Sequence, residues 1–183
     1  MSSRLAGPFY KSYVKNLGLK GNERVLEPGS GSGGLSAYIA PILLKGKGKL
    51  TCVDISKAQM RVLRIRMRKY PNVEYKLGDI SKMDIEDGSF DAAIIHFMLH
   101  EVEQPSRQNF VKTISRKLKA GGKLFIREPI RESHGMPVEE IRQLMAEGGL
   151  KEIDHKLTRS IFMGPMYVGI FEKRIRSRQE HVG

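Results

Sequence analysis

Residues 29–34 are all glycine or serine, and they follow directly after a short apolar run that ends at Glu27 and Pro28. Glycine tolerates tight turns and lets a ligand come close to the backbone. From Ala37 onward the sequence takes up an apolar helical pattern. Strand, glycine loop and helix in this order are how doubly wound α/β folds hold a nucleotide-like ligand. The loop therefore predicts an α/β fold with a nucleoside-type site.

The rest of the chain alternates β-like runs with helical stretches, which favours a mostly parallel sheet. The strands are expected over residues 24–27, 49–54, 73–77, 90–95, 123–127, 150–160 and 166–173. The helices are expected over residues 8–17, 33–44, 57–69, 105–118 and 137–146, the third of them capped by Ser56. The last two strands are joined at Gly164 and Pro165 without a helix, so they should be antiparallel.

The length of 183 residues suits one domain with a sizeable core and leaves little room for a second. We assign residues 1–173 to this domain and residues 174–183 to a basic C-terminal tail. No run reaches the roughly 20 apolar residues that a membrane helix needs. The start, residues 1–8, lacks the apolar core of a signal peptide. We therefore expect a cytoplasmic protein without a transmembrane segment, and its oligomeric state stays open.

The net charge of +12 favours acidic partners such as nucleic acid, with a well-solvated cationic surface as the equally weighted alternative. The most basic stretch, residues 61–69, falls on a predicted helix, where a solvated face is the preferred interpretation. The single cysteine, Cys52, excludes an intramolecular disulfide and a cysteine-based metal site, and no metal is expected. Cys52 lies in an apolar run and should be a buried core thiol.

Two acids stand at the ends of predicted strands, next to the glycine loop. Asp54 ends the second strand, where its carboxylate can accept two hydrogen bonds from a ribose diol. Asp79 follows the third strand, where it can accept from an adenine amino group. The glycines alone do not identify the ligand, because Gly29, Gly31 and Gly34 also satisfy the pattern of a dinucleotide-binding loop.

With these partners the chain resembles the class I S-adenosylmethionine-dependent methyltransferases over roughly residues 8–173. The resemblance rests on five segments in order: residues 25–33, 53–56, 78–80, 90–94 and 118–122. It implies a Rossmann-like seven-stranded sheet with an antiparallel end, which argues against a nicotinamide enzyme. It also implies S-adenosylmethionine as the cofactor and S-adenosylhomocysteine as its product.

The resemblance assigns roles to individual residues around the cofactor. Glu27 would orient the loop and meet the methionine amino group through water or the backbone. Gly29 and Gly31 would let the loop backbone approach the methionine and ribose. Gly33 is the third glycine of the methyltransferase pattern, which Gly29 and Gly31 begin. The remaining cofactor-binding residues are expected to be Asp54 on the ribose, Ile55 beside the adenine, Asp79 on the adenine amino group, Ile80 through its backbone, and His96 on the methionine part through its main chain.

Residues 95–102 look most like the ubiquinone/menaquinone-biosynthesis-like branch, whose members mostly act on small molecules. A small organic acceptor is therefore preferred; the alternatives are an RNA or protein acceptor and a non-catalytic cofactor-binding scaffold. A general base is needed only if the acceptor loses a proton. Because histidine titrates near neutral pH, His100 is the first candidate, ahead of Glu101, Glu128 and His134. Its alternative is a helix-start histidine bonded to the backbone, and Glu128 is expected to pair with Arg127 or Arg131.

Overall fold

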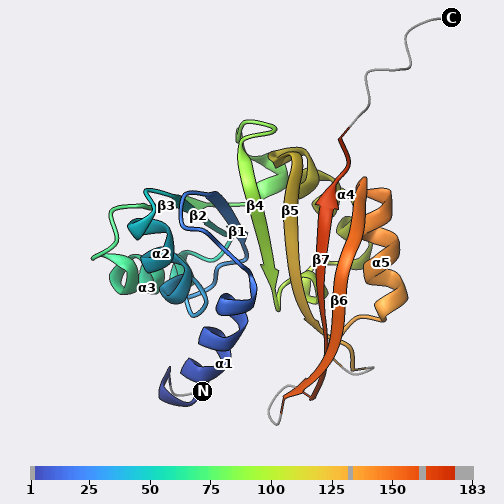
Figure 1. Cartoon of the computed structure of the whole chain (residues 1–183), viewed down its shortest axis with the longest axis horizontal. Coiled ribbons are helices and arrows are strands. Elements are labelled where there is room, and N and C mark those ends of the chain that lie inside the picture. The colour runs from blue at the N-terminus through green and yellow to red at the C-terminus, as the bar shows by residue number, and fades with distance from the viewer. Residues whose placement is uncertain (1–2, 132–133, 161–163, 176–183) are drawn as a thin grey trace, which may run out of the picture.

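The computed structural model describes residues 3–131, 134–160 and 164–175, which form a seven-stranded sheet with helices on both faces (Figure 1). The strand order is β3-β2-β1-β4-β5-β7-β6. The strands are β1 (Arg24–Pro28), β2 (Lys49–Asp54), β3 (Val73–Leu77), β4 (Phe90–His96), β5 (Leu118–Pro129), β6 (Leu150–Ser160) and β7 (Gly164–Lys173). The helices are α1 (Ser3–Asn16), α2 (Ser36–Lys45), α3 (Lys57–Met67), α4 (Gln104–Lys117) and α5 (Val138–Glu147), with short 3-10 helices η1 (Ile80–Lys82) and η2 (Leu99–Glu101).

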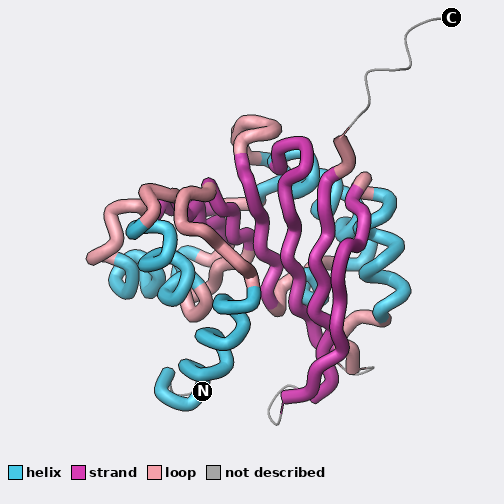
Figure 2. Tube along the Cα trace, in the orientation of Figure 1, coloured by secondary structure: helices cyan, strands magenta, loops and turns pink. Residues whose placement is uncertain are grey.

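The first five strands are parallel, and β7 is antiparallel to both β5 and β6. The expected α/β fold with an antiparallel C-terminal hairpin is therefore confirmed. Figure 2 shows this hairpin running beyond the end of β4. The basic tail expected over 174–183 lies outside the described residues from 176 onward.

Side chains alternate across the sheet and so supply two separate cores. In β4, Ala92 and Ile94 pack with α1, α2 and α3, whereas Ala93 and Ile95 pack with α4 and α5. This double burial explains why the strand is apolar throughout. The same alternation sends neighbouring side chains of β5 to opposite faces.

Several boundaries differ from the sequence-based expectation, most of all the starts of α1, α2 and β5. Helix α2 begins at Ser36 and not at Gly33, because Gly33 has φ +80° and remains in the loop. Helix α1 begins at Ser3, so Pro8 lies inside it and does not start it. Strand β5 begins at Leu118 and not at Lys123, and its pairing with β4 is irregular between the pairs Phe90–Leu118 and Ala92–Lys123.

The fold brings the ends of β1, β2 and β4 to one edge of the sheet, as parallel pairing requires. Helix α1 lies beside this end of β4 in Figure 1, and Tyr10 and Tyr13 of α1 both contact the ring of His96. The candidate site is built at this edge.

Candidate functional site

A pocket of about 200 Å³ opens at the end of β1, against the glycine loop. Its walls come from the loop, from α1 and from the end of β4. The lining residues are Tyr10, Glu27, Pro28, Gly29, Ser30, Gly31, Ser32, Gly34, Leu35, His96 and Phe97. Of the predicted cofactor-binding residues, the pocket brings together Glu27, Gly29, Gly31 and His96.

The loop glycines serve different purposes. Gly29, Gly31 and Gly33 have φ values of +66°, +54° and +80°, in the left-handed region that favours glycine. A Cβ atom at Gly29 would collide with the side chain of Met98, and one at Gly33 with Leu63. A Cβ atom at Gly31 would meet nothing within 4 Å. Gly31 is therefore required by the turn, whereas Gly29 and Gly33 are required by the turn and by close packing.

Glu27 is buried beneath the loop and ties it to its neighbours. Its carboxylate accepts hydrogen bonds from Ser36 Oγ at 2.6 Å and from the Cys52 thiol at 3.7 Å. Burial raises the pKa of Glu27 to about 7, although the hydrogen bonds from Ser36 and Cys52 act in the opposite direction. Glu27 thus connects β1, β2 and the start of α2, which fits a role in orienting the loop. Cys52 is buried in the core, as expected.

Asp54 supports the same loop from the neighbouring strand. Its Oδ2 accepts from the Gly31 N–H at 2.7 Å and its Oδ1 accepts from the Ser56 N–H at 2.8 Å. Ser56 in turn caps α3 as predicted, accepting from the Gln59 N–H. Asp54 does not line the pocket itself, but it contacts Gly31, which does.

The other residues expected around an adenine ring lie at the ends of β2 and β3. The side chain of Ile55 is 76% exposed. Asp79 accepts from the Ser81 N–H at 2.9 Å, and its second oxygen lies 3.8 Å from Lys82 Nζ. The Ile80 side chain is buried in the core, so only its backbone could meet a ligand. None of these three lines the pocket, yet the backbone bond from Gly78 N–H to the Asp54 carbonyl keeps their two loops adjacent.

The chain turns sharply after β4. Phe97 has φ +53°, an uncommon conformation for a bulky residue, and it persists because its N–H donates to the Arg127 carbonyl at 2.9 Å and its ring stacks on Phe9. His96 is partly buried, with its ring packed against Tyr10, Tyr13 and Phe97, and this desolvation together with the nearby charge of Arg127 lowers its pKa to about 3. The imidazole of His96 is therefore neutral near pH 7.

His100 is held by Glu128, and this corrects one expectation. His100 Nδ1 lies 2.6 Å from Glu128 Oε2, and Glu128 Oε1 accepts from the backbone N–H groups of Met98 and Leu99. Glu128 therefore pairs with His100 and not with Arg127 or Arg131, since its side chain points to the face of the sheet opposite Arg127. The hydrogen bond that His100 donates to the Glu128 carboxylate raises the pKa of His100.

The remaining candidate bases are less enclosed. Glu101 lies 3.1 Å from His100 Nε2 and is 75% exposed, and His134 is exposed in its loop. Neither they nor His100 line the pocket. Sequence reasoning missed Tyr10 and Ser30 as pocket residues. A serine in the loop was a detectable signal, whereas the placement of Tyr10 depends on how α1 docks.

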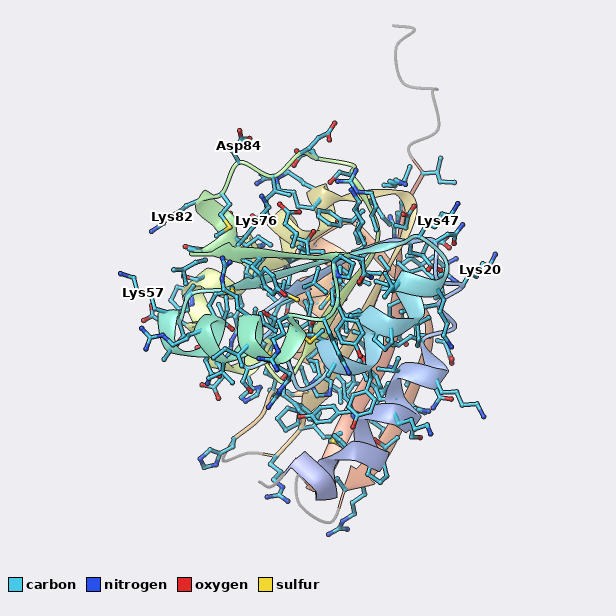
Figure 3. The ribbon with its side chains drawn as sticks, turned by 90° about the vertical axis from the view of Figure 1, so that its left-hand side faces the viewer. Lys20, Lys47, Lys57, Lys76, Lys82 and Asp84 are labelled. Carbon is cyan, nitrogen blue, oxygen red and sulfur yellow. The ribbon has the colours of Figure 1, made fainter. Side chains whose placement is uncertain are left out.

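The basic stretch 61–69 is exposed on α3, where Arg64 lies over the Tyr75 ring at 4.8 Å. Lys20, Lys47, Lys57 and Lys82 stand at the periphery of the molecule in Figure 3. In the described ranges, no helix combines the length and the apolar character needed to cross a membrane. Within those same ranges, no three His, Cys, Asp or Glu side chains are grouped as metal ligands.

Comparison with known proteins places this geometry in a family. The model of the methyltransferase domain matches residues 25–122, which include the glycine loop and the ends of β2, β3 and β4. Demethylmenaquinone methyltransferase of Tropheryma whipplei (strain Twist) is 31% identical over 118 residues, which cover 64% of this chain and 46% of that protein. The chain thus spans about half the length of this relative.

Solved structures agree on the fold. The N-methyltransferase NodS of Bradyrhizobium japonicum WM9, in complex with S-adenosylhomocysteine, superposes with a TM-score of 0.76 at 17% identity, covering 91% of this chain and 86% of that one. The 1,6-didemethyltoxoflavin-N1-methyltransferase of Burkholderia thailandensis gives a TM-score of 0.72 at 16% identity, covering 94% of this chain and 78% of that one. Because the domain model matches more than half of its residues, the chain belongs to the methyltransferase domain family, and its resemblance to the class I S-adenosylmethionine-dependent methyltransferases is confirmed.

Proposed function

We propose that this chain transfers the methyl group of S-adenosylmethionine to a small organic molecule and releases S-adenosylhomocysteine. The observation that carries the proposal is the pocket at the end of β1, walled by a glycine loop that Glu27 and Asp54 hold in place. In a chain of the methyltransferase domain family, a pocket at this position fits the methionine and ribose parts of the cofactor.

The residues present suit this cofactor. The space above Gly31 is open, so its backbone can meet a ligand directly. Each carboxylate oxygen of Asp54 uses one acceptor position for a backbone N–H and has another available for a ribose hydroxyl. Glu27 contributes a carboxyl group to the pocket wall and would interact with the amino group of the methionine part. We further propose that Ile55, Asp79 and the Ile80 backbone surround the adenine.

The chemistry makes modest demands on the protein. The bound cofactor supplies an activated methyl group: the acceptor's nucleophilic atom bonds to the methyl carbon as the carbon–sulfur bond breaks, and the electron pair stays on sulfur. The protein must align the two partners and exclude water. The aromatic side chains Tyr10 and Phe97 line the pocket and perform part of this exclusion.

A proton on the attacking atom must leave to water or to a base. We propose His100 as this base, because Glu128 fixes its Nδ1 and its Nε2 faces only the exposed side chain of Glu101, whose 3.1 Å contact an acceptor would displace. A buried carboxylate that orients an imidazole in this way is a common arrangement for a general base.

The acceptor class rests on different support. The Tropheryma whipplei relative acts on demethylmenaquinone according to its name, and the Burkholderia thailandensis enzyme was crystallised with a small heterocycle. The net charge of +12 favours RNA or protein as the second candidate acceptor. Transfer of labelled methyl groups into a cell extract, fractionated into small molecules, RNA and protein, separates the two; label that disappears after nuclease treatment would overturn the small-molecule proposal.

Cofactor binding is tested by calorimetry with S-adenosylhomocysteine. Asp54→Ala should weaken binding at least about 10-fold, because it removes a ribose acceptor and releases the Gly31 N–H. The matched control is Asp84→Ala, an exposed acid away from the loop, which should bind as the wild type does. Absence of binding to the wild type would refute the enzyme proposal and the scaffold alternative together. Binding without transfer to any fraction would favour the scaffold. The cytoplasmic location stays a prediction, which cell fractionation tests.

A further inference from the structure

Arg127 is a buried charge without a charged partner. It lies near the end of β5, beside His96 of β4, and only 7% of it is exposed. It takes part in none of the ion pairs formed by the described residues. Among the described residues, its Nε and Nη1 atoms also have no hydrogen-bond partner. A guanidinium in this position is incomplete, because buried charges are normally paired and hydrogen-bonded.

The side chains around Arg127 share this lack of partners. Among the described residues, six buried side-chain polar atoms have no hydrogen-bond partner, and four of them belong to this one cluster. They are Tyr13 OH, His96 Nε2, and Arg127 Nε and Nη1. So many unmatched polar atoms at one place indicate a site that a ligand completes, since scattered packing defects would not gather beside the pocket.

Aromatic rings enclose the guanidinium. Its carbon lies 3.6 Å from the ring centroid of Phe9, 4.9 Å from Tyr13 and 5.6 Å from Phe97. Ring faces attract the positive charge but leave its N–H groups without acceptors. The cluster thus offers flat apolar walls together with in-plane donors, a combination that suits a planar acid.

The cluster adjoins the candidate cofactor pocket. Its members His96 and Phe97 also line that pocket, and Tyr10, which contacts the His96 ring, forms part of the same wall. A molecule held against Arg127 would therefore lie next to the candidate cofactor pocket. Phe9 of α1 lies over the guanidinium at 3.6 Å, so it must move aside to admit a ligand.

We propose that Arg127, His96 and the aromatic side chains of α1 and Phe97 form the acceptor subsite, and that this subsite takes a planar aromatic carboxylate. This inference rests on the proposed methyl transfer, whose acceptor it specifies, and not on the role proposed for His100, which Glu128 holds on the opposite face of the sheet. The carboxylate would accept two hydrogen bonds from the guanidinium, and the aromatic ring would take the place of Phe9 against its face. Neutral His96 adds one hydrogen bond to a polar group on the ring.

The guanidinium keeps its charge in this environment. Burial lowers the pKa of Arg127 to about 10, while the phenol groups of Tyr13 and Tyr10 act in the opposite direction. At neutral pH the subsite is therefore cationic, and an acid is favoured over its neutral amide.

The test is a calorimetric titration of the chain saturated with S-adenosylhomocysteine, using 2-, 3- and 4-hydroxybenzoate and the corresponding hydroxybenzamides as probes. At least one acid should bind about 10-fold or more tightly than its amide, as expected for a charge-assisted pair. Arg127→Met should abolish this preference while binding of S-adenosylhomocysteine changes less than about 2-fold, because Arg127 does not line the cofactor pocket. Arg159→Met, an exposed arginine of β6, is the matched control and should behave as the wild type does.

Three outcomes would overturn the proposal: equal binding of acid and amide, unchanged acid binding by Arg127→Met, or no acid binding to the loaded protein. In each of these, bound S-adenosylhomocysteine leaves the proposed function intact. Failure of S-adenosylhomocysteine itself to bind instead refutes the proposed function. If Arg127→Met does not fold, the comparison of acid with amide on the wild type decides the question alone.

Discussion

Removing the Glu128 carboxylate should destabilise the fold more than removing any exposed acid. Glu128 is fully buried and serves three groups, namely the N–H groups of Met98 and Leu99 and the Nδ1 of His100. Glu128→Ala leaves all three without a partner, and each buried unmatched polar group costs roughly 1–3 kcal/mol. The expected loss in the free energy of unfolding is about 3–5 kcal/mol, the range found when one partner of a buried pair is removed.

Glu128→Gln separates geometry from charge. Its amide oxygen can still accept from the two backbone N–H groups, while the charge-assisted bond to His100 is lost, so about 1.5–3 kcal/mol is expected. Glu101→Gln removes the other, exposed partner of His100 and should change stability by less than about 1 kcal/mol. Urea unfolding followed by circular dichroism measures all three variants. The argument fails if Glu128→Ala costs no more than Glu101→Gln.

The same pair predicts a direction with pH. The pKa of His100 is raised in the folded chain by Glu128, so the stability from this pair is fully present below the unfolded pKa of about 6.5. It is lost as the pH rises through the raised folded value. The difference in the free energy of unfolding between the wild type and Glu128→Gln should therefore be larger at pH 6 than at pH 9. A difference that grows toward alkaline pH would contradict this assignment.

The remaining predictions concern the loop. Gly29→Ala should lower the melting temperature more than Gly31→Ala, because both suffer from positive φ but only the first collides with Met98; scanning calorimetry of the two variants would expose an equal effect. Burial raises the pKa of Glu27 to about 7, above its unfolded value, so its contribution to stability falls as the pH rises from about 4.5 through 7. The free energy of unfolding of Glu27→Gln, measured with urea, should therefore rise relative to that of the wild type between pH 5 and pH 8. A difference between the two proteins that does not change with pH would disprove the raised pKa.

Local patterns in the sequence were sufficient to predict most of the fold. The alternation of apolar runs, the cap at Ser56 and the absence of a helix between the last two strands each depend on neighbouring residues, and each appears in the structure. The junction itself was placed wrongly, because Gly164 and Pro165 lie in β7 and pair with Ser160 and Arg159 of β6. The start of α2 was placed three residues early because helical periodicity does not show that Gly33 adopts a positive φ. Boundaries depend on backbone conformation, which composition constrains only weakly.

The site could be predicted only where the strand ends determine it. The glycine loop, Asp54 and Asp79 follow their strands directly, so parallel pairing brings them to one edge. The contacts of Tyr10 with His96, and of Glu128 with His100, join segments 86 and 28 residues apart. Such contacts require knowledge of how α1 docks and where the turn after β4 leads, and no local pattern contains either.

Arg127 and Glu128 show how a strand can separate opposite charges that are neighbours in sequence. From sequence alone they are an obvious ion pair, yet successive side chains of a strand point to opposite faces, so they cannot meet. Glu128 finds its partners in the turn after β4, on the face that α4 and α5 cover. Arg127 emerges under α1, where the described residues offer it rings and no carboxylate. The charge of Glu128 is thus compensated inside the protein, whereas that of Arg127 is left for a ligand. The two residues therefore need different experiments: a measurement of stability for Glu128 and of the binding of an acid for Arg127.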